Sequence, residues 1–330
     1  MKKLLSFLTL ALAFTACTND NPAILSEKKS TGLSLVADAN PEWQYENLRI
    51  YPVVAEPSVA AIQANLQHLK TLEEGMSTPG FRITELKQFG RTREQSVNAL
   101  TVQNKSRDTI FLMSGDVVTG GNQDRVIAQD QVVAPGTVRN IDVFCVEKGR
   151  WHYDDPTASE NEKNIYAFKG YYNVASPQVR SAVQRSGNQN EVWNAVAKVT
   201  SANQAESGTH TYAALETANE AKNKRDAYLR YFAGKPEHLA NMVGMVVVCG
   251  DQVLGVDIFG HPDLFRRQYD ALMHGYVAEA ATTVCAAQSA DSQAKAAFNT
   301  VSRLAAPGTK SGEDAGKFEF NGSWVHLFRK

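Results

Sequence analysis

Residues 48–151 carry mainly the apolar and polar pattern of strands, with one early helix among them. Asn98–Gln103 and Thr109–Met113 flank a polar, turn-forming stretch and predict an antiparallel pair. Val126–Val133 and Val138–Val146 predict a second pair, because the proline and glycine between them fit the central positions of a type II turn. We therefore expect the N-terminal half of the folded part to be rich in β-hairpins.

Helical spacing of apolar residues marks four segments. An early helix is predicted at Val59–Leu72, with three aliphatic side chains on one face. The stretch Ser176–Ala233 is predicted to be mainly helical, with a Ser-Pro start and a glycine stop. Amphipathic helices are predicted at Pro262–Val284 and Ala290–Leu304.

Two more hairpins lie among and after these helices. Val243–Cys249 and Gln252–Phe259 meet at Gly250-Asp251, and the last hairpin turns at Asn321-Gly322. Strands and helices are segregated along the chain rather than alternating. The predicted fold class is therefore α+β, with a β-rich N-terminal half, a helical middle, a further hairpin, long amphipathic helices and a C-terminal hairpin.

The start of the chain has the layout of an export signal. Lys2 and Lys3 precede the apolar run Leu4–Phe14, and two small residues precede Cys17, as in a bacterial lipobox. The run is too short to span a bilayer, which takes about 20 residues. We predict a signal peptide at residues 1–16 and lipidation of Cys17; an ordinary cut after Ala13 is the alternative.

If the chain is a lipoprotein, its domain organisation and its cellular location follow. Residues 17–40 are polar without a regular period and are expected to form a flexible tether, followed by a single α+β domain at 41–330. One acyl chain holds a protein only marginally, so several chains, palmitate among them, are expected on the cysteine. The expected location is the bacterial cell envelope, at the outer membrane, with the membrane as a partner.

The net charge and the number of cysteines limit the classes of partner and the disulfide pairings that can be expected. The formal charge of −1 becomes −3 once Lys2 and Lys3 leave, so nothing indicates a nucleic-acid partner. Cys145, Cys249 and Cys285 are an odd number and cannot all pair with one another. They are either buried small hydrophobic residues or contain one disulfide, and both alternatives stay open.

Strong catalytic and metal signatures are absent from the sequence. There is no Cys-x-x-Cys, His-Glu-x-x-His, Gly-x-Ser-x-Gly or strand-linked Gly-x-Gly-x-x-Gly, and no two histidines are three or four residues apart. His152 with Asp154 and Asp155 could hold a cation, or could simply form a polar loop. No metal is predicted, and no cofactor is identified.

Two regions stand out as candidate sites. Gly115–Arg125 places three glycines and several polar residues between strands, where backbone N–H groups can approach an anion, unless the glycines are purely structural. On the next predicted strand, alternate residues point to the same face and the last of them is Glu147; Arg150 and Trp151 follow the end of the strand. An acid, a cation and an aromatic side chain fit a ligand or acid/base site, or a Glu–Arg pair that staples the loop. The candidate binding residues are Gln123, Arg125, Glu147, Arg150 and Trp151.

The same two regions resemble the ARG-and-rhodanese-phosphatase-superfamily-associated domain family. Later stretches fit as well, at Val243–Val247, Gly255–Gly260 and Asp263–Phe265, so that the resemblance covers most of residues 45–285. The family's name implies genomic company with ADP-ribosylglycohydrolase and rhodanese-phosphatase proteins, and thereby ADP-ribose or nucleotide metabolism. The resemblance supplies no catalytic residue.

Three functional hypotheses follow. The first is a lipid-anchored module that binds a small-molecule ligand or an envelope protein. The second is an enzyme acting on an ADP-ribose-like or phosphorylated small molecule, with Glu147 as acid or base and Arg125 and Arg150 clamping the anion. The third is a purely structural surface protein. An open pocket shared by the candidates would favour the enzyme, whereas mutual pairing would count against it.

Overall fold

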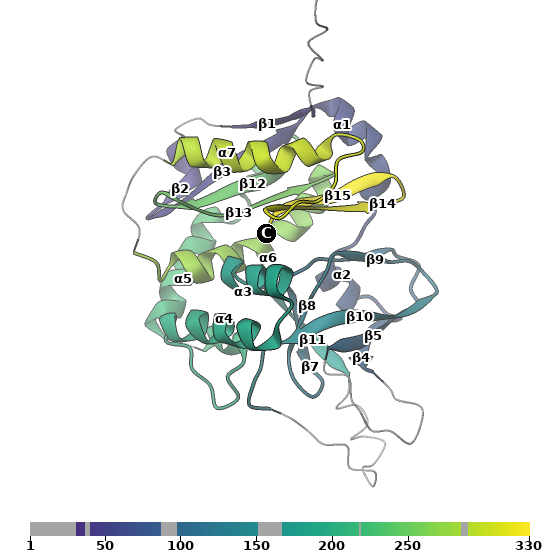
Figure 1. Cartoon of the computed structure of the whole chain (residues 1–330), viewed down its shortest axis with the longest axis vertical. Helices are drawn as coiled ribbons and strands as arrows, with labels where there is room; N and C mark the ends of the chain where they lie inside the picture. Colours follow the sequence, from purple (N-terminus) through teal and green to yellow (C-terminus); the bar gives the residue numbers. More distant parts are fainter. Residues whose placement is uncertain (1–30, 37–39, 87–97, 151–166, 218, 285–289) are drawn as a thin grey trace, which may run out of the picture. The chain divides into compact units, whose positions relative to one another are not determined.

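The computed structural model describes residues 31–36, 40–86, 98–150, 167–217, 219–284 and 290–330. Thr31–Lys330 form one compact unit. Within the described ranges the chain has seven α-helices and fifteen strands, and every strand pairing is antiparallel (Figure 1). The fold is therefore α+β, as the segregated order of strands and helices predicted.

The larger sheet joins the two ends of the described chain. Its strand order is β1-β3-β12-β13-β15-β14, with β2 also paired to β3. The strands are β1 (Leu33–Leu35), β2 (Gln44–Tyr45), β3 (Leu48–Ala55), β12 (Met242–Cys249), β13 (Gln252–Phe259), β14 (Ala315–Phe320) and β15 (Ser323–Arg329). All eight residues of β12 are buried. A strand with apolar side chains on both faces must be covered on both faces, and helices cover it here.

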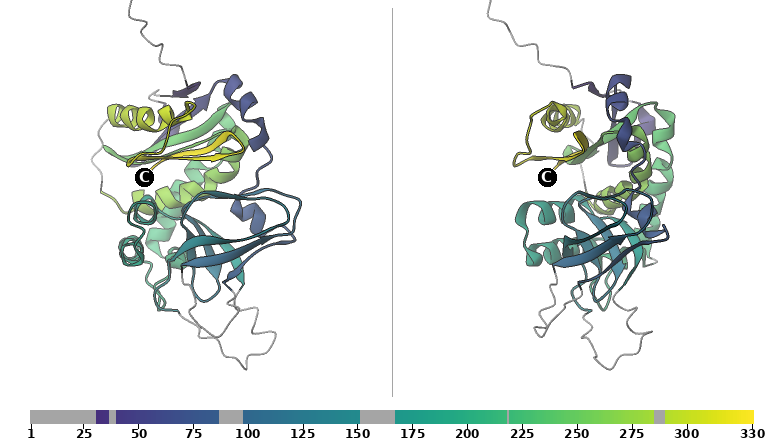
Figure 2. Two further views of the ribbon diagram at one scale, coloured as in Figure 1. Left: turned by 45° about the vertical axis from the view of Figure 1, so that its right-hand side comes forward. Right: turned by 90° about the vertical axis from the view of Figure 1, so that its right-hand side faces the viewer.

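Helices α6 (Pro262–Ala280) and α7 (Asp291–Ser302) contact β12 and β13, and each helix belongs to a separate hydrophobic cluster. Figure 2 shows the two helices and the sheet in two further views. The cluster beside α6 includes Val325, and the cluster beside α7 includes Trp324. Because neighbouring residues of a strand point to opposite faces, α6 and α7 cover opposite faces of this sheet.

The second β-region consists of a six-stranded sheet and a two-stranded one. The larger has the order β11-β7-β8-β10-β5-β4, and β6 pairs with β9. The strands are β4 (Phe81–Glu85), β5 (Ala99–Asn104), β6 (Ile110–Leu112), β7 (Asp116–Gly120), β8 (Arg125–Ile127), β9 (Gln131–Val133), β10 (Thr137–Cys145) and β11 (Phe168–Val174). The remaining helices are α1 (Pro57–Ile62), α2 (Leu72–Met76), α3 (Pro177–Ser181), α4 (Gln189–Ala202) and α5 (Glu220–Phe232).

The predicted β-hairpins with the strongest turn signals are confirmed. β12 pairs with β13 across Gly250-Asp251, and β14 pairs with β15 across Asn321-Gly322. Asn321 and Gly322 both have positive φ, 51° and 80°, as a type I′ turn requires. The helical middle and the two late amphipathic helices are confirmed as well.

The two hairpins predicted near the start are wrong in their partners. β5 pairs with β4 and β10, whereas β6 pairs with β9, so the strands on either side of the first turn enter different sheets. The Pro-Gly turn does form, with Thr137 N–H donating to the Ala134 carbonyl and φ of 73° at Gly136. Its two strands, β9 and β10, nevertheless separate, and β10 pairs with β8 instead.

Two other predictions need correction. The single helix expected at 59–72 does not form, because the backbone of Lys70 pairs with Ile110 and its neighbours instead of continuing a helix. Ile62, which was expected on the apolar face of that helix, is 78% exposed. Within the stretch expected to be a tether, Leu33–Leu35 form β1, since Leu33 is buried beside β3. The other residues of that stretch lie largely outside the described ranges, as does Cys17.

The two cysteines that the structure describes differ. Cys145 is a buried thiol, as expected of a small hydrophobic residue. Cys249 is disulfide-bonded, so the alternative of one disulfide holds for it. Cys285 lies outside the described residues.

Candidate functional site

Four of the five candidate residues come together at one edge of the six-stranded sheet. β8 and β10 are antiparallel, with Arg125 opposite Cys145, so the loop before β8 lies beside the segment that follows β10. This register brings Gln123 and Arg125 close to Glu147 and Arg150. Trp151 lies outside the described residues, as do His152 and the two aspartates that follow it.

Arg150 is the centre of this arrangement. Its Nε donates to both carboxylate oxygens of Glu147 at 2.9 Å, and its Nη2 donates to Glu147 at 2.6 Å and to Asp124 at 3.0 Å. Its Nη1 donates to the Gly121 carbonyl at 2.8 Å. Thr211 donates to the second oxygen of Asp124 at 2.6 Å. Charge-assisted bonds of this number fix the loop before β8 to the end of β10.

Arg125 lies beneath this set and is fully buried. Its Nη1 donates to the Gln123 carbonyl at 2.6 Å, and its Nη2 is 3.6 Å from a carboxylate oxygen of Glu85. The same Glu85 oxygen accepts the Asn122 N–H at 2.7 Å. The loop approaches so closely that a Cβ on Gly121 would stand 2.6 Å from Glu85, which explains a glycine there. We call Glu85, Asp124, Arg125, Glu147 and Arg150 the Arg150 cluster.

The pKa values of the cluster's acids diverge with their surroundings. Burial raises the pKa of Glu85 and of Asp124 above their ordinary values. Burial also acts to raise the pKa of Glu147, but hydrogen bonds, above all from Arg150, outweigh it and hold that pKa below its ordinary value. Glu147 is therefore a carboxylate committed to its partners. This mutual pairing matches the stapling alternative and counts against Glu147 as an acid or base in catalysis.

A second polar network joins the two β-regions, and none of its residues was among the candidates predicted from the sequence. His326 on β15 is fully buried, with Nδ1 2.7 Å from Asp130 and Nε2 3.1 Å from Asp257 on β13. Asp257 accepts two bonds from Arg180 of α3, at 2.5 and 3.0 Å, and one from the Tyr276 hydroxyl at 2.5 Å. We call Asp130, His326, Asp257 and Arg180 the buried ionic row.

Acidic and basic residues alternate along the buried ionic row. Burial acts to lower the pKa of His326, but the carboxylates of Asp130 and Asp257 outweigh it and raise the pKa to about 9. Burial acts to raise the pKa of Asp257, but Arg180 and His326 hold it far below its ordinary value. The only signal in the sequence was an aspartate and a histidine inside otherwise apolar strands.

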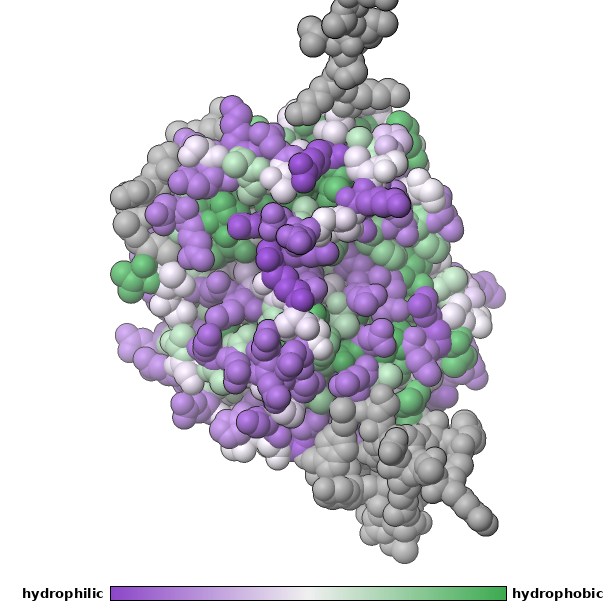
Figure 3. Space-filling model, in the orientation of Figure 1, coloured by the Kyte–Doolittle hydropathy of each residue, from purple (hydrophilic) through white to green (hydrophobic). Residues whose placement is uncertain are grey.

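An open groove of about 690 Å³ lies at the Arg180 end of the row. Arg180 and Tyr276 belong both to its lining and to the network just described. Other lining residues come from α4, the start of β13, α6 and the end of β15. Hydrophilic side chains predominate over the middle of the face on which α3 and the end of β15 lie (Figure 3). The Arg150 cluster and the groove share no residue.

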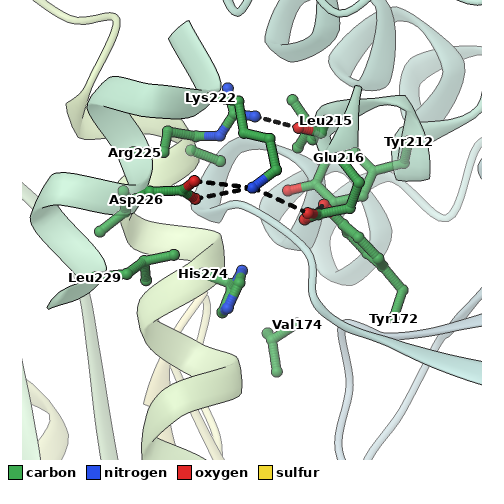
Figure 4. Close-up of a pocket in the computed structure, with 12 residues that line it drawn as sticks. Tyr172, Val174, Tyr212, Leu215, Glu216, Lys222, Arg225, Asp226, Leu229 and His274 are labelled. Carbon is green, nitrogen blue, oxygen red and sulfur yellow. Dashed lines mark hydrogen bonds and ion pairs between the residues drawn. The ribbon is translucent and has the colours of Figure 1, made fainter. Parts of the chain in front are cut away.

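A smaller cavity lies between α5 and α6 (Figure 4). Lys222 projects into it and pairs with Asp226 at 2.9 Å and Glu216 at 3.6 Å. Its volume of about 10 Å³ is close to that of one water molecule, so it cannot hold a small-molecule ligand.

In the part of the chain that the structure describes, no three His, Cys, Asp or Glu side chains are grouped to hold a metal ion. Across those ranges no helix combines the length and apolarity needed to cross a membrane.

Comparison with known proteins adds one finding. The model of the ARG and Rhodanese-Phosphatase-superfamily-associated Protein domain matches residues 37–324. No curated protein and no solved structure matches the chain. The matched range contains the Arg150 cluster and three members of the buried ionic row, and it ends just before the fourth, His326.

Proposed function

We propose that this chain, which belongs to the ARG and Rhodanese-Phosphatase-superfamily-associated Protein domain family, is a lipid-anchored protein of the bacterial cell envelope whose domain binds a small molecule in the groove. The groove is the observation that carries the binding proposal. Ligand pockets commonly enclose about 300–1,000 Å³, and its volume of about 690 Å³ falls inside that range.

The groove's construction supports the same proposal. Its floor residues Arg180 and Tyr276 are held by Asp257, so they do not need to reorganise when a ligand arrives. The guanidinium of Arg180 is buried and is held by its two bonds to Asp257.

The anchor is supported by the sequence. The charged start, the apolar run and the small residues before Cys17 are together the features of a lipoprotein signal. Several acyl chains on Cys17 would hold the protein stably at the outer membrane.

A groove-filling variant tests the binding proposal. Ala202 of α4 lines the groove, whereas Ala197 on the same helix is exposed and does not. The detergent-solubilised full-length protein would be screened by thermal shift against nucleotides, ADP-ribose, sugars and short peptides. A ligand at 100 times its dissociation constant stabilises by about 2.7 kcal/mol. We expect at least one ligand to stabilise the wild type and Ala197→Trp but not Ala202→Trp. A shift that persists in Ala202→Trp, or no shift with any class, would overturn the proposal.

A further inference from the structure

The groove's lining is strongly cationic. Five of its residues are basic and one is acidic: Arg180, Arg185, Lys198, Arg329 and Lys330 against Glu279. Arg180 is neutralised by its two bonds to Asp257. Arg185 donates to the main-chain oxygen of Lys330 at 2.7 Å and is 3.6 Å from Asp314, but the Arg185 and Asp314 side chains are exposed, so their ion pair contributes little.

The other three cations have no such neutralisation. Within the described ranges no carboxylate lies within 4.0 Å of the charged nitrogens of Lys198, Arg329 or Lys330. Arg329 donates to the Val253 carbonyl at 2.9 Å, and Lys330 donates to the Gly312 carbonyl at 3.0 Å. Carbonyls hold these two side chains in place without removing their charge.

The single acidic side chain of the lining offsets only part of this charge, because five basic residues face it. A carboxylate oxygen of Glu279 accepts the backbone N–H of Gln178 at 3.0 Å; burial raises the pKa of Glu279, and this hydrogen bond acts in the opposite direction. Basic side chains gathered in a concave surface focus a positive potential and concentrate anions there. Because the whole chain has a formal charge of −1, this positive potential is a local property of the groove.

We infer that the groove binds a small molecule through a phosphate or diphosphate group, held by Lys198 of α4 and Arg329 of β15. This inference rests on the proposed function and specifies its ligand class. Lysine acts on phosphate as a point charge, and arginine adds paired N–H donors, so the two cations complement one another. The phosphate belongs either to a soluble metabolite or to a lipid headgroup, since both present the same chemistry.

The test compares ligands that differ only in phosphate. Affinities would be measured by calorimetry on the full-length protein for ribose 5-phosphate against ribose, glycerol 3-phosphate against glycerol, and inorganic pyrophosphate. The glycerol pair represents a lipid headgroup and the ribose pair a soluble metabolite. We expect the phosphorylated member of at least one pair to bind at least tenfold more tightly than its neutral counterpart, and affinity to fall as salt rises.

The charge variants assign this affinity to the groove. Lys198→Gln with Arg329→Gln should weaken phosphate binding at least tenfold. Lys169→Gln with Arg139→Gln removes the same charges from exposed positions outside the groove and should leave binding unchanged. Equal binding of charged and neutral partners, or no loss in the Lys198 and Arg329 variant, would overturn the inference. If a neutral ligand still binds and Ala202→Trp abolishes it, the proposed function survives that failure.

Discussion

His326 should make the stability of the fold depend on pH between neutral and alkaline conditions. Its imidazole is buried between Asp130 and Asp257, which raise its pKa to about 9 against an ordinary value near 6.5. A raised folded-state pKa gives stability that is fully present below about pH 6.5 and is lost as the pH rises through about 9. Asp257 and Tyr276 do not titrate in this window, because the pKa of Asp257 lies far below it and that of Tyr276 well above it.

The size of the effect follows from the pKa difference. One unit corresponds to 1.36 kcal/mol, so a shift from about 6.5 to about 9 contributes about 3 kcal/mol to the free energy of unfolding. His326 is fully buried, so solvent does not screen this contribution. This agrees with the typical cost of breaking a buried ion pair by removing one partner, about 3–5 kcal/mol, because replacing His326 leaves the same two carboxylates with one cation fewer.

Urea unfolding at pH 6.0 and pH 9.5, followed by tryptophan fluorescence, measures the effect. We expect His326→Gln to be less stable than wild type by about 3 kcal/mol at pH 6.0, and the difference to shrink at pH 9.5. His68→Gln, at an exposed histidine, should follow the wild type at both pH values. The reasoning is refuted if the difference between His326→Gln and wild type is the same at the two pH values.

Three further predictions concern other parts of the chain. Cys17→Ser should abolish incorporation of labelled palmitate and move the protein from the detergent phase to the aqueous phase in a phase-partition assay; an unchanged distribution would contradict the lipid anchor. Gly255→Ala should destabilise by about 1–3 kcal/mol in thermal unfolding, because its Cβ would collide with a buried tyrosine hydroxyl, whereas Gly312→Ala, with open space, should change little. Glu147→Gln should cost about 1–3 kcal/mol in urea unfolding by leaving Arg150 with weaker acceptors, and a neutral effect would show that the pair does not staple the loop.

In the polar regions of the chain, most residues of the Arg150 cluster could be predicted from the sequence, but their contacts could not. The glycines and charged residues of Gly115–Arg125, and Glu147 with Arg150, were identified from residue type and position, and the structure brings them into one cluster. Whether they face a ligand or one another was not readable, because that depends on Glu85 and Thr211, which come from distant segments. The groove escaped prediction for the same reason, since its walls come from separate helices and strands.

The sequence alone determined the features that depend on neighbouring residues. Turn chemistry at Gly250-Asp251 and Asn321-Gly322, and the periodicity of α6, specified the late hairpins and helices. Only the tertiary structure decided the partners of β5 and β6, because pairing across sheets is set by the burial of distant side chains. It also decided that Asp257 and His326 are charged inside apolar strands, since a buried charge is stable only where another chain segment supplies its counter-charge.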